Sequence, residues 1–406
     1  MGIEERLIRY CRIDTQSDPY SKTSPSTAKQ FALADLLKEE LTELGLEDVV
    51  RDEYCYVYGH LPSNLDKPCR TVGFIAHMDT APDYSGTDVK PRIIRNYDGK
   101  DIRLNDETIM SVEDFPQLPG FAGKDLMVTD GTTLLGADDK AGITAIMEAL
   151  VYWQSHPEVK HGPVAVAFTP DEEVGRGTEH FDLERFGADF AYTMDGDAVN
   201  VYSDETFNAA SAEAEAFGFS IHPGAAKNKM INALNVIHEF HALLPEEMRP
   251  EHTEKRDGFY HMTRLNGNTD HAKAEYIIRD HDGGLFEKKK EWMLYCAEVL
   301  NRKYGKKVLS VTVRDSYKNM KEVLKQYPEV SGIAVQCIRE LGLDPVNESI
   351  RGGTDGAMLS FMGLPCPNLG TGGGNYHGRY EYCVLQELEL AVQLIIKIAE
   401  KTALEG

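Results

Sequence analysis

Paired cysteines are missing from this sequence. Its seven cysteines are an odd number, lie scattered along the chain, and include no Cys-x-x-Cys pair. A disulfide framework needs paired cysteines, and a thiolate zinc site needs closely spaced ones, so the sequence predicts neither. We therefore expect a protein of the reducing cytoplasm.

Long apolar runs and basic runs are also scarce. No segment approaches the roughly 18 consecutive apolar residues of a transmembrane helix, and the first residues are charged where a signal peptide would be apolar. The formal net charge is −23, and no basic run is longer than Lys288 to Lys290. We expect neither nucleic acid nor membrane among the partners, because both anionic surfaces would repel this chain.

The first third of the chain alternates between helical and strand patterns. Apolar residues keep helical spacing from Phe31 to Leu44, and a second helix is expected after the pair Asp138-Asp139. Short apolar runs that end in polar residues predict buried strands at 71–76, 164–168 and 190–194. The pattern is that of an α/β fold with its polar residues at the ends of strands.

The pattern changes near residue 208. It predicts strands at 213–221, 258–265, 273–279 and 308–314, and helices at 228–244 and 284–304. The order βαββαβ is that of a ferredoxin-like α+β domain. A helical stretch at 319–343 then returns the chain to the α/β style. We predict a discontinuous catalytic domain of residues 1–207 and 319–406, with residues 208–318 inserted as a lid.

Acids and histidines gather at the ends of the predicted strands and in the loops that follow them. They are His77, Asp79, Asp138, Asp139, Glu172, Glu173, Asp195 and His377. Each motif alone has an ordinary structural interpretation, such as a helix cap or a solvated loop. Together they lie at the edge of an α/β sheet where ligands bind, and a mixture of imidazole and carboxylate favours zinc over magnesium.

Two neighbouring metal ions need one bridging carboxylate, and each also needs a histidine and a carboxylate of its own. The matching set here has Asp139 as the bridge. His77 and Asp195 would bind one metal, while Glu173 and His377 would bind the other. We expect two Zn²⁺ ions per chain, with Co²⁺ or Mn²⁺ as substitutes.

Two further acids then take separate roles. Asp79 lies two residues beyond His77 and is placed to accept the second N–H of that imidazole. Glu172 and Glu173 are neighbours, so only one of them can reach the same metal. Glu172 is left as the general base that takes a proton from the metal-bridging water and returns it to the leaving amine.

Five stretches of this sequence resemble the M20 metallopeptidases. They are residues 74–80, 135–142, 169–175, 192–196 and 375–378. Five more, at 13–17, 207–210, 276–280, 350–356 and 359–365, look like signatures of the peptidase T group within that family. The resemblance implies a zinc-peptidase-like mixed sheet flanked by helices, and an aminopeptidase that removes the N-terminal residue from short peptides, chiefly tripeptides.

The resemblance also implies three residues that bind substrate. His222 looks like the lid histidine that steadies the oxyanion, and Arg279 looks like the arginine that grips the far carboxylate of the peptide. Arg351 is a second candidate for that carboxylate. The chain departs from the family at 197–204, where glycines and a glutamate are expected, and at 267–272 in the lid.

Other activities remain open from sequence alone. A carboxypeptidase, a dipeptidase or an N-acyl amino acid deacylase would use the same metal core, and a non-catalytic metal-binding protein could keep the same fold. A phosphoryl-transfer enzyme is disfavoured because the chain has no Gly-x-x-x-x-Gly-Lys-Ser/Thr loop. Short peptides are the expected partners, and pairing of two chains into a homodimer is left open.

Overall fold

The computed structural model describes residues 1–405, and the contacts within it divide the chain into two units. Unit 1 comprises Met1–Asp204, Val323–Glu348 and the chain from Thr354 onward. Unit 2 comprises Glu205–Glu322 and the short segment Ser349–Gly353. The chain therefore passes between the units four times, whereas the predicted insertion of residues 208–318 requires only two passages.

An eight-stranded mixed sheet forms the centre of unit 1, in the order β1-β2-β8-β3-β9-β16-β10-β15. Its strands are β1 (Glu47–Arg51), β2 (Val57–Leu61), β3 (Val72–His77), β8 (Val164–Thr169), β9 (Phe190–Gly196), β10 (Val201–Ser203), β15 (Val346–Asn347) and β16 (Asn368–Gly370). The four central strands, β8, β3, β9 and β16, run parallel to one another. Their carboxyl ends consequently meet at one edge of the sheet.

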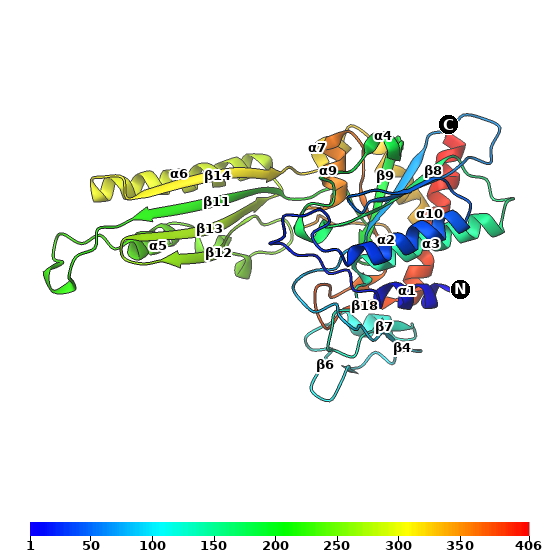
Figure 1. The fold of residues 1–406 in the computed structure, drawn as a ribbon, viewed down its shortest axis with the longest axis horizontal. Coiled ribbons are helices and arrows are strands. Elements are labelled where there is room, and N and C mark those ends of the chain that lie inside the picture. Colours follow the sequence, from blue (N-terminus) through cyan, green and yellow to red (C-terminus); the bar gives the residue numbers. More distant parts are fainter. Residues whose placement is uncertain (406) are drawn as a thin grey trace. The chain divides into compact units, whose positions relative to one another are not determined.

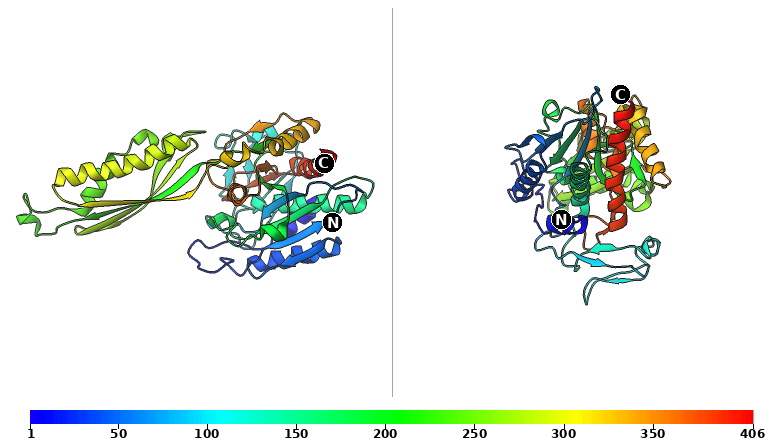
Figure 2. Two further views of the ribbon diagram at one scale, coloured as in Figure 1. Left: turned by 90° about the horizontal axis from the view of Figure 1, so that it is seen from above. Right: turned by 90° about the vertical axis from the view of Figure 1, so that its right-hand side faces the viewer.

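Side chains on the central strands alternate between the two faces of the sheet. Phe74, Val166 and Tyr192 belong to the larger core on one face, while Ile75 and Ala167 belong to a smaller core on the other. On the larger side α3 (Ala137–Ser155) packs on β3 and β9, and α10 (Leu385–Glu405) packs on α3. The long α10 is drawn red in Figure 2. Burial on both faces explains why these strands are apolar throughout.

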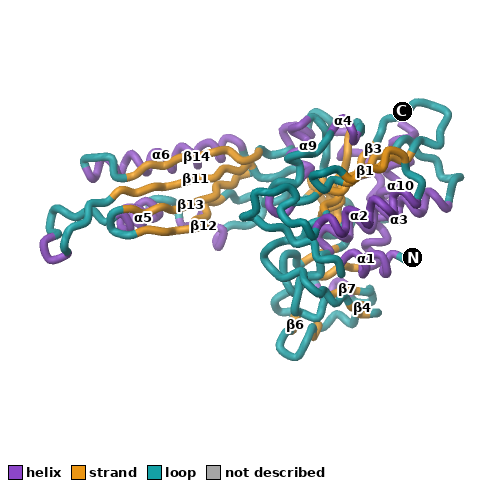
Figure 3. The backbone as a smooth tube through the Cα atoms, viewed as in Figure 1, coloured by secondary structure: helices purple, strands orange, loops and turns teal. Residues whose placement is uncertain are grey.

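The remaining helices of unit 1 surround this sheet. They are α1 (Ile3–Cys11), α2 (Gln30–Glu43), α4 (Leu183–Phe186), α8 (Pro328–Glu340) and α9 (Asp355–Met362), while α7 (Lys321–Leu324) lies where the chain returns from unit 2. Much of the chain between β3 and α3 is loop (Figure 3). This stretch contains the short strands β4 (Arg92–Ile94), β5 (Ile102–Arg103), β6 (Ile109–Met110) and β7 (Leu126–Val128). Two strands from later in the chain, β17 (Gly373–Gly374) and β18 (Tyr382–Val384), complete a small sheet with β7 and β4.

Unit 2 is a four-stranded antiparallel sheet covered on one face by two helices (Figure 1). In chain order its elements are β11 (Asn208–Phe217), α5 (Ala233–Ala242), β12 (Phe259–Gly267), β13 (His271–Asp280), α6 (Gly283–Tyr304) and β14 (Leu309–Tyr317). The buried positions of β11 are alanines from Ala210 to Ala216. Small side chains there let α5 and α6 approach the sheet closely.

Three predicted elements differ clearly from the structure. The helix predicted at 228–244 is shorter, because α5 begins at Ala233 and ends at Ala242. The helical stretch predicted at 319–343 is two helices, because Pro328 cannot continue α7 and instead begins α8. The strand predicted at 213–221 begins five residues earlier, at Asn208, and ends at Phe217. Its buried alanines carry little of the β-branched and aromatic signal by which strands are recognised.

No helix among residues 1–405 is both long enough and apolar enough to cross a membrane.

Candidate metal and active site

Histidine and carboxylate side chains meet where the central parallel strands of unit 1 end. His77 is the last residue of β3 and pairs with Thr169, the last residue of β8. Glu172 and Glu173 follow β8 in a single 3-10 turn, and Asp195 lies at the end of β9. The parallel arrangement thus gathers at one edge residues that are far apart in sequence.

Asp138 joins two groups of ligating atoms. On one side, His77 Nε2 lies 2.9 Å from Asp138 Oδ1 and 3.6 Å from Asp195 Oδ1. On the other, His377 Nε2 lies 3.4 Å from Asp138 Oδ2 and 2.9 Å from Glu173 Oε2. In each group the three ligating atoms lie within 4.8 Å of one another. Asp138 therefore offers one carboxylate oxygen to each group.

The structure does not bring Asp139, the predicted bridging carboxylate, to the histidines, and its neighbour Asp138 occupies that position instead. The buried Asp139 carboxylate accepts hydrogen bonds from the backbone N–H groups of His77 and Gly142, each at 3.1 Å. Both aspartates have non-helical backbone angles before α3 becomes regular, so their side chains point in different directions. Asp139 anchors the first turn of α3 to the end of β3, while Asp138 faces the histidines.

The orientation of His77 is fixed by the residue two positions on. Its Nδ1 lies 3.0 Å from the backbone oxygen of Asp79 and 3.4 Å from the Asp79 carboxylate. Donation from Nδ1–H leaves Nε2, the atom that faces Asp138 and Asp195, free to bind a metal. The Asp79 carboxylate accepts the backbone N–H groups of Glu172 and Glu173, at 3.0 and 3.2 Å. Asp79 thus ties the loop after β8 to His77.

The adjacent glutamates have different surroundings. Glu173 belongs to the His377 group, and burial together with the charge of Asp138 raises its pKa to about 8. Glu172 belongs to neither group of ligating atoms, and burial, with the charges of Asp195 and Asp355 adding to it, raises its pKa well above the ordinary value. Glu172 is therefore a carboxyl group that can accept and keep a proton beside the two groups.

These residues fit a pair of metal cations. The buried Oε1 of Glu173 has no hydrogen-bond partner among residues 1–405, as expected for an oxygen reserved for a cation. Burial and the charge of Asp138 also raise the pKa of Asp195, to about 6, so the crowded carboxylates favour bound positive charge. Imidazole and carboxylate ligands in two groups that share one carboxylate suit divalent transition metals.

Comparison with known proteins places the chain in a family. Residues 125–401 match the model of the peptidase family M20/M25/M40. A protein named Peptidase T from Alkaliphilus oremlandii is 52% identical, with 98% of each chain covered. The chain belongs to the M20 peptidases. A Peptidase T from Bacillus velezensis is 49% identical over 98% of this chain and 97% of its own length, which places this M20 peptidase in the peptidase T group.

Solved structures share the fold of this M20 peptidase. Aminopeptidase PepT from Bacillus cereus superposes with a TM-score of 0.78 at 23% identity, covering 99% of this chain and 100% of that one. A tripeptidase from Staphylococcus aureus gives 0.79 at 22% identity, with 99% and 98% covered. A dinuclear metal-binding M20 peptidase from Bacillus subtilis gives 0.65 at 16% identity, with 99% and 98% covered. The predicted fold class is confirmed.

One residue of the site carries no recognisable sequence signal. Glu381 is 1% exposed, and its carboxylate accepts three backbone N–H groups from the loop before α3. Those of Leu135 and Gly136 reach Oε2 at 2.7 and 2.8 Å, and that of Asp138 reaches Oε1 at 2.9 Å. Glu381 therefore positions the loop that carries Asp138, the carboxylate shared by the two groups of ligating atoms in this M20 peptidase.

The three predicted substrate-binding residues lie in unit 2. His222 is exposed, and its Nδ1 accepts the backbone N–H of Gly224 at 3.1 Å. Arg279 donates from Nη1 to the backbone oxygens of Ala210 and Ile278. Arg351 donates to the backbone oxygens of residues 255 and 257 and lies over the ring of residue 207. Its guanidinium thus already holds unit 2 segments together.

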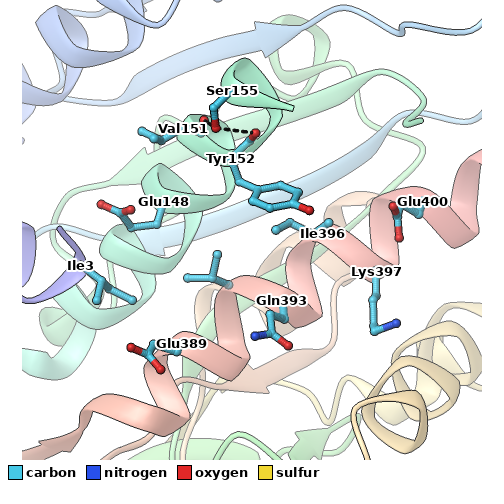
Figure 4. A pocket seen from close by; sticks show the side chains of 11 residues that line it. Ile3, Glu148, Val151, Tyr152, Ser155, Glu389, Gln393, Ile396, Lys397 and Glu400 are labelled. Carbon is cyan, nitrogen blue, oxygen red and sulfur yellow. Dashed lines mark hydrogen bonds between the residues drawn. The ribbon is translucent and has the colours of Figure 1, made fainter. Parts of the chain in front are cut away.

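A groove lies between α3 and α10 of unit 1 (Figure 4). It has a volume of about 660 Å³, and its lining includes Ile3, Tyr152, Ile396 and Lys397. None of the candidate ligands contributes to it. The candidate site of this M20 peptidase is therefore identified by its converging ligating atoms, and it does not coincide with the groove between α3 and α10.

Proposed function

We propose that this protein is a two-zinc aminopeptidase that releases the N-terminal residue from short peptides, above all tripeptides. The observation that carries the proposal is the Asp138 carboxylate shared between two histidine–carboxylate groups, with Glu172 beside them. The named activities of the relatives, Peptidase T, aminopeptidase PepT and a tripeptidase, support it.

The proposed metal ligands are His77, Asp138 and Asp195 for one ion and Asp138, Glu173 and His377 for the other. Two imidazoles among carboxylates favour zinc, and Co²⁺ or Mn²⁺ are the expected substitutes. Such cations, when bound, lower the pKa of water and polarise the peptide carbonyl.

Glu172 is proposed as the general base. Its raised pKa allows its carboxylate to take the proton of the attacking water and then deliver it to the departing amine. Asp79 acts through its neighbours, because it accepts the backbone N–H groups of both glutamates and lies against the ring of His77. It is a positioning residue for the base.

His222 and Arg279 are proposed to contact the substrate. Since Nδ1 of His222 accepts a hydrogen bond from Gly224, its proton belongs on Nε2, which suits a donor to a developing oxyanion. Arg279 has donors beyond Nη1 for the carboxylate at the far end of a peptide. Arg351, whose Nη1 is occupied by backbone oxygens, is the weaker candidate for that contact.

The function is tested with one tripeptide in three forms: free, N-acetylated and C-terminally amidated. Products are identified by mass spectrometry after chelator treatment and after zinc is restored. We expect release of the first residue from the free tripeptide, little release from the amide because Arg279 then lacks its carboxylate partner, loss of activity on acetylation, and dependence on zinc. Release of the last residue would instead indicate a carboxypeptidase, and an undiminished rate on the acetylated peptide would indicate a deacylase.

Replacing the base tests the mechanism. Glu172→Gln removes the proton acceptor while keeping the shape of the side chain, so we expect turnover to fall by about 100-fold or more, the range of a positioned acid–base group. Metal content should stay at the wild-type value, since Glu172 belongs to neither group of ligating atoms. Near-normal turnover in this variant would show that another group is the base.

The cellular setting is part of the proposal. All seven cysteines are unpaired, and six of them are buried, which suits a reducing cytoplasm. Pairing of two chains into a homodimer stays a prediction, and sedimentation of the intact chain tests it directly.

A further inference from the structure

A cavity of about 520 Å³ lies beside the candidate metal site in unit 1, lined by residues that include Phe121, Asp197, Gly373, Asn375, Tyr382 and Glu387. Asp197 follows the ligand Asp195 by two residues, and Asn375 precedes the ligand His377 by two. Two residues of extended chain span at most about 7 Å. The lining of the cavity therefore comes within two residues, along the chain, of one candidate ligand in each group.

The segments that carry the lining residues Asn375 and Asp197 are joined by a hydrogen bond. The hydroxyl of Tyr376 donates to the backbone oxygen of Gly196 at 3.1 Å, linking the loop of His377 to the end of β9. Glycine allows a close approach in one wall, because a Cβ at Gly374 would meet the hydroxyl oxygen of Tyr382 at 2.4 Å. The cavity is thus part of the same loop framework that holds the ligands.

The carboxylate of Asp197 has no counter-charge. Among residues 1–405 its side chain makes no hydrogen bond or ion pair, although its backbone oxygen accepts the N–H groups of Thr371 and Gly372. The other acid of the cavity, Glu387, is paired with Lys124 at 2.6 Å. The cavity consequently contains one free negative charge.

The remaining walls offer apolar surface. The rings of Phe121 and Tyr382 lie 5.3 Å apart, centre to centre, and suit methylene groups, while the ammonium of Lys124 already lies 5.6 Å from the centre of the Phe121 ring. An ammonium group needs little more room than a water molecule, roughly 30 Å³. A cavity many times larger, with a single unpaired carboxylate, fits a long side chain that ends in a positive charge.

We propose that this cavity is a specificity subsite that binds the basic side chain of a substrate residue next to the scissile bond, with Asp197 as its carboxylate partner. The inference rests on the proposed peptidase function. The peptide's own α-ammonium is a different group, because it is one atom from the reacting carbonyl and must stay over the ligating residues. The subsite therefore distinguishes lysine or arginine from neutral residues of the same length.

The test compares Lys-Ala-Ala with norleucine-Ala-Ala, and Ala-Lys-Ala with Ala-norleucine-Ala, because norleucine keeps the chain and lacks the charge. For the wild-type holoenzyme we expect kcat/KM to favour lysine at least tenfold in one of the two pairs, which also identifies the position. Asp197→Asn should remove that preference while metal content and the norleucine rates stay within about twofold. Its backbone contacts to residues 371 and 372 do not involve the side chain.

Two further variants sharpen the result. Asp197→Lys should reverse the preference toward glutamate at the same position. Asp106→Asn, at a fully exposed acid, makes the same change in net charge as Asp197→Asn and should leave every lysine-to-norleucine ratio unchanged. An equal lysine-to-norleucine ratio in wild type and Asp197→Asn overturns the subsite, and so does an equal loss on all four peptides. If the wild type cleaves none of them, the proposed function falls as well.

Discussion

At the scale of single residues, two adjacent carboxylates perform different tasks. Asp138 faces His77 and His377 with one oxygen each, while Asp139 accepts backbone N–H groups of His77 and Gly142. One is placed to hold metals and the other holds the chain. Their different surroundings predict different consequences for the same chemical change.

Asp138→Asn should abolish metal binding in both groups, because an amide cannot supply a negatively charged oxygen to each. Asp139→Asn should keep the metals and lower the free energy of unfolding by about 1 to 3 kcal/mol, the cost of leaving a buried N–H without its acceptor. Metal content by mass spectrometry and thermal unfolding separate the two. Equal loss of metal in both variants would contradict this assignment.

The sequence predicted which residue types converge, and it could not decide between neighbours. Strand ends located His77, Asp195, Glu173 and His377, and the structure brings all four to one edge. The choice between Asp138 and Asp139 depends on the backbone angles before α3, which no spacing encodes. Glu381 was missed because a single acid in a loop has no pattern.

At the scale of elements, the loop from Leu135 to Asp138 is held by the carboxylate of Glu381. Three backbone N–H groups point at its two oxygens, and the side chain is buried. Burial of the carboxyl group raises its pKa, to about 7, although the three N–H groups oppose this shift. The position of the Asp138 carboxylate thus depends on a residue 243 positions away.

Glu381→Gln should weaken metal binding by about 10- to 100-fold, the usual effect of removing a group that orients metal ligands. The amide nitrogen of glutamine cannot accept an N–H, so at least one of the three loses its acceptor. Competition with a chelator measures the affinity. Glu389→Gln, an exposed change in α10, is the matched control. Unchanged affinity in Glu381→Gln would show that the loop holds its position without this carboxylate.

Elements were predictable where their patterns were long. The buried central strands and the helices α3 and α6 follow continuous apolar or amphipathic runs, and their positions agree with the predicted ranges to within a few residues. Strands of two or three residues, such as β5 and β17, depend on partners elsewhere in the chain. Local sequence carries no period over so short a run.

At the scale of the whole molecule, unit 2 is assembled from segments that enter and leave it at four places. Glu205, its first residue, holds these segments together. Its buried carboxylate is gripped by both Nη atoms of Arg256, by Lys321 Nζ at 3.1 Å, by Asn319 Nδ2 at 3.2 Å and by Ser349 Oγ at 3.0 Å. The two segments of unit 2, Glu205–Glu322 and Ser349–Gly353, therefore share one anion.

The stability of unit 2 should consequently depend on pH. Burial alone would raise the pKa of Glu205, but the hydrogen bonds from Arg256, Lys321 and Asn319 outweigh it and lower the pKa to about 2. A carboxyl group whose pKa is depressed on folding adds stability above its unfolded value, near 4.5, and loses it as the pH falls toward 2. We expect about 2 kcal/mol, less than the full shift implies, because Arg256 and Lys321 remain half exposed.

The two tryptophans let each unit be followed by itself, since Trp153 lies in unit 1 and Trp292 in unit 2. In a Trp153→Phe background, Glu205→Gln should lower the denaturant midpoint reported by Trp292 at pH 7. The difference in midpoint between this variant and the parent that keeps Glu205 should narrow steadily below pH 4.5. In a Trp292→Phe background, the transition reported by Trp153 should not move. A difference that persisted undiminished at pH 3 would mean that the contacts of Glu205, and not its charge, stabilise unit 2.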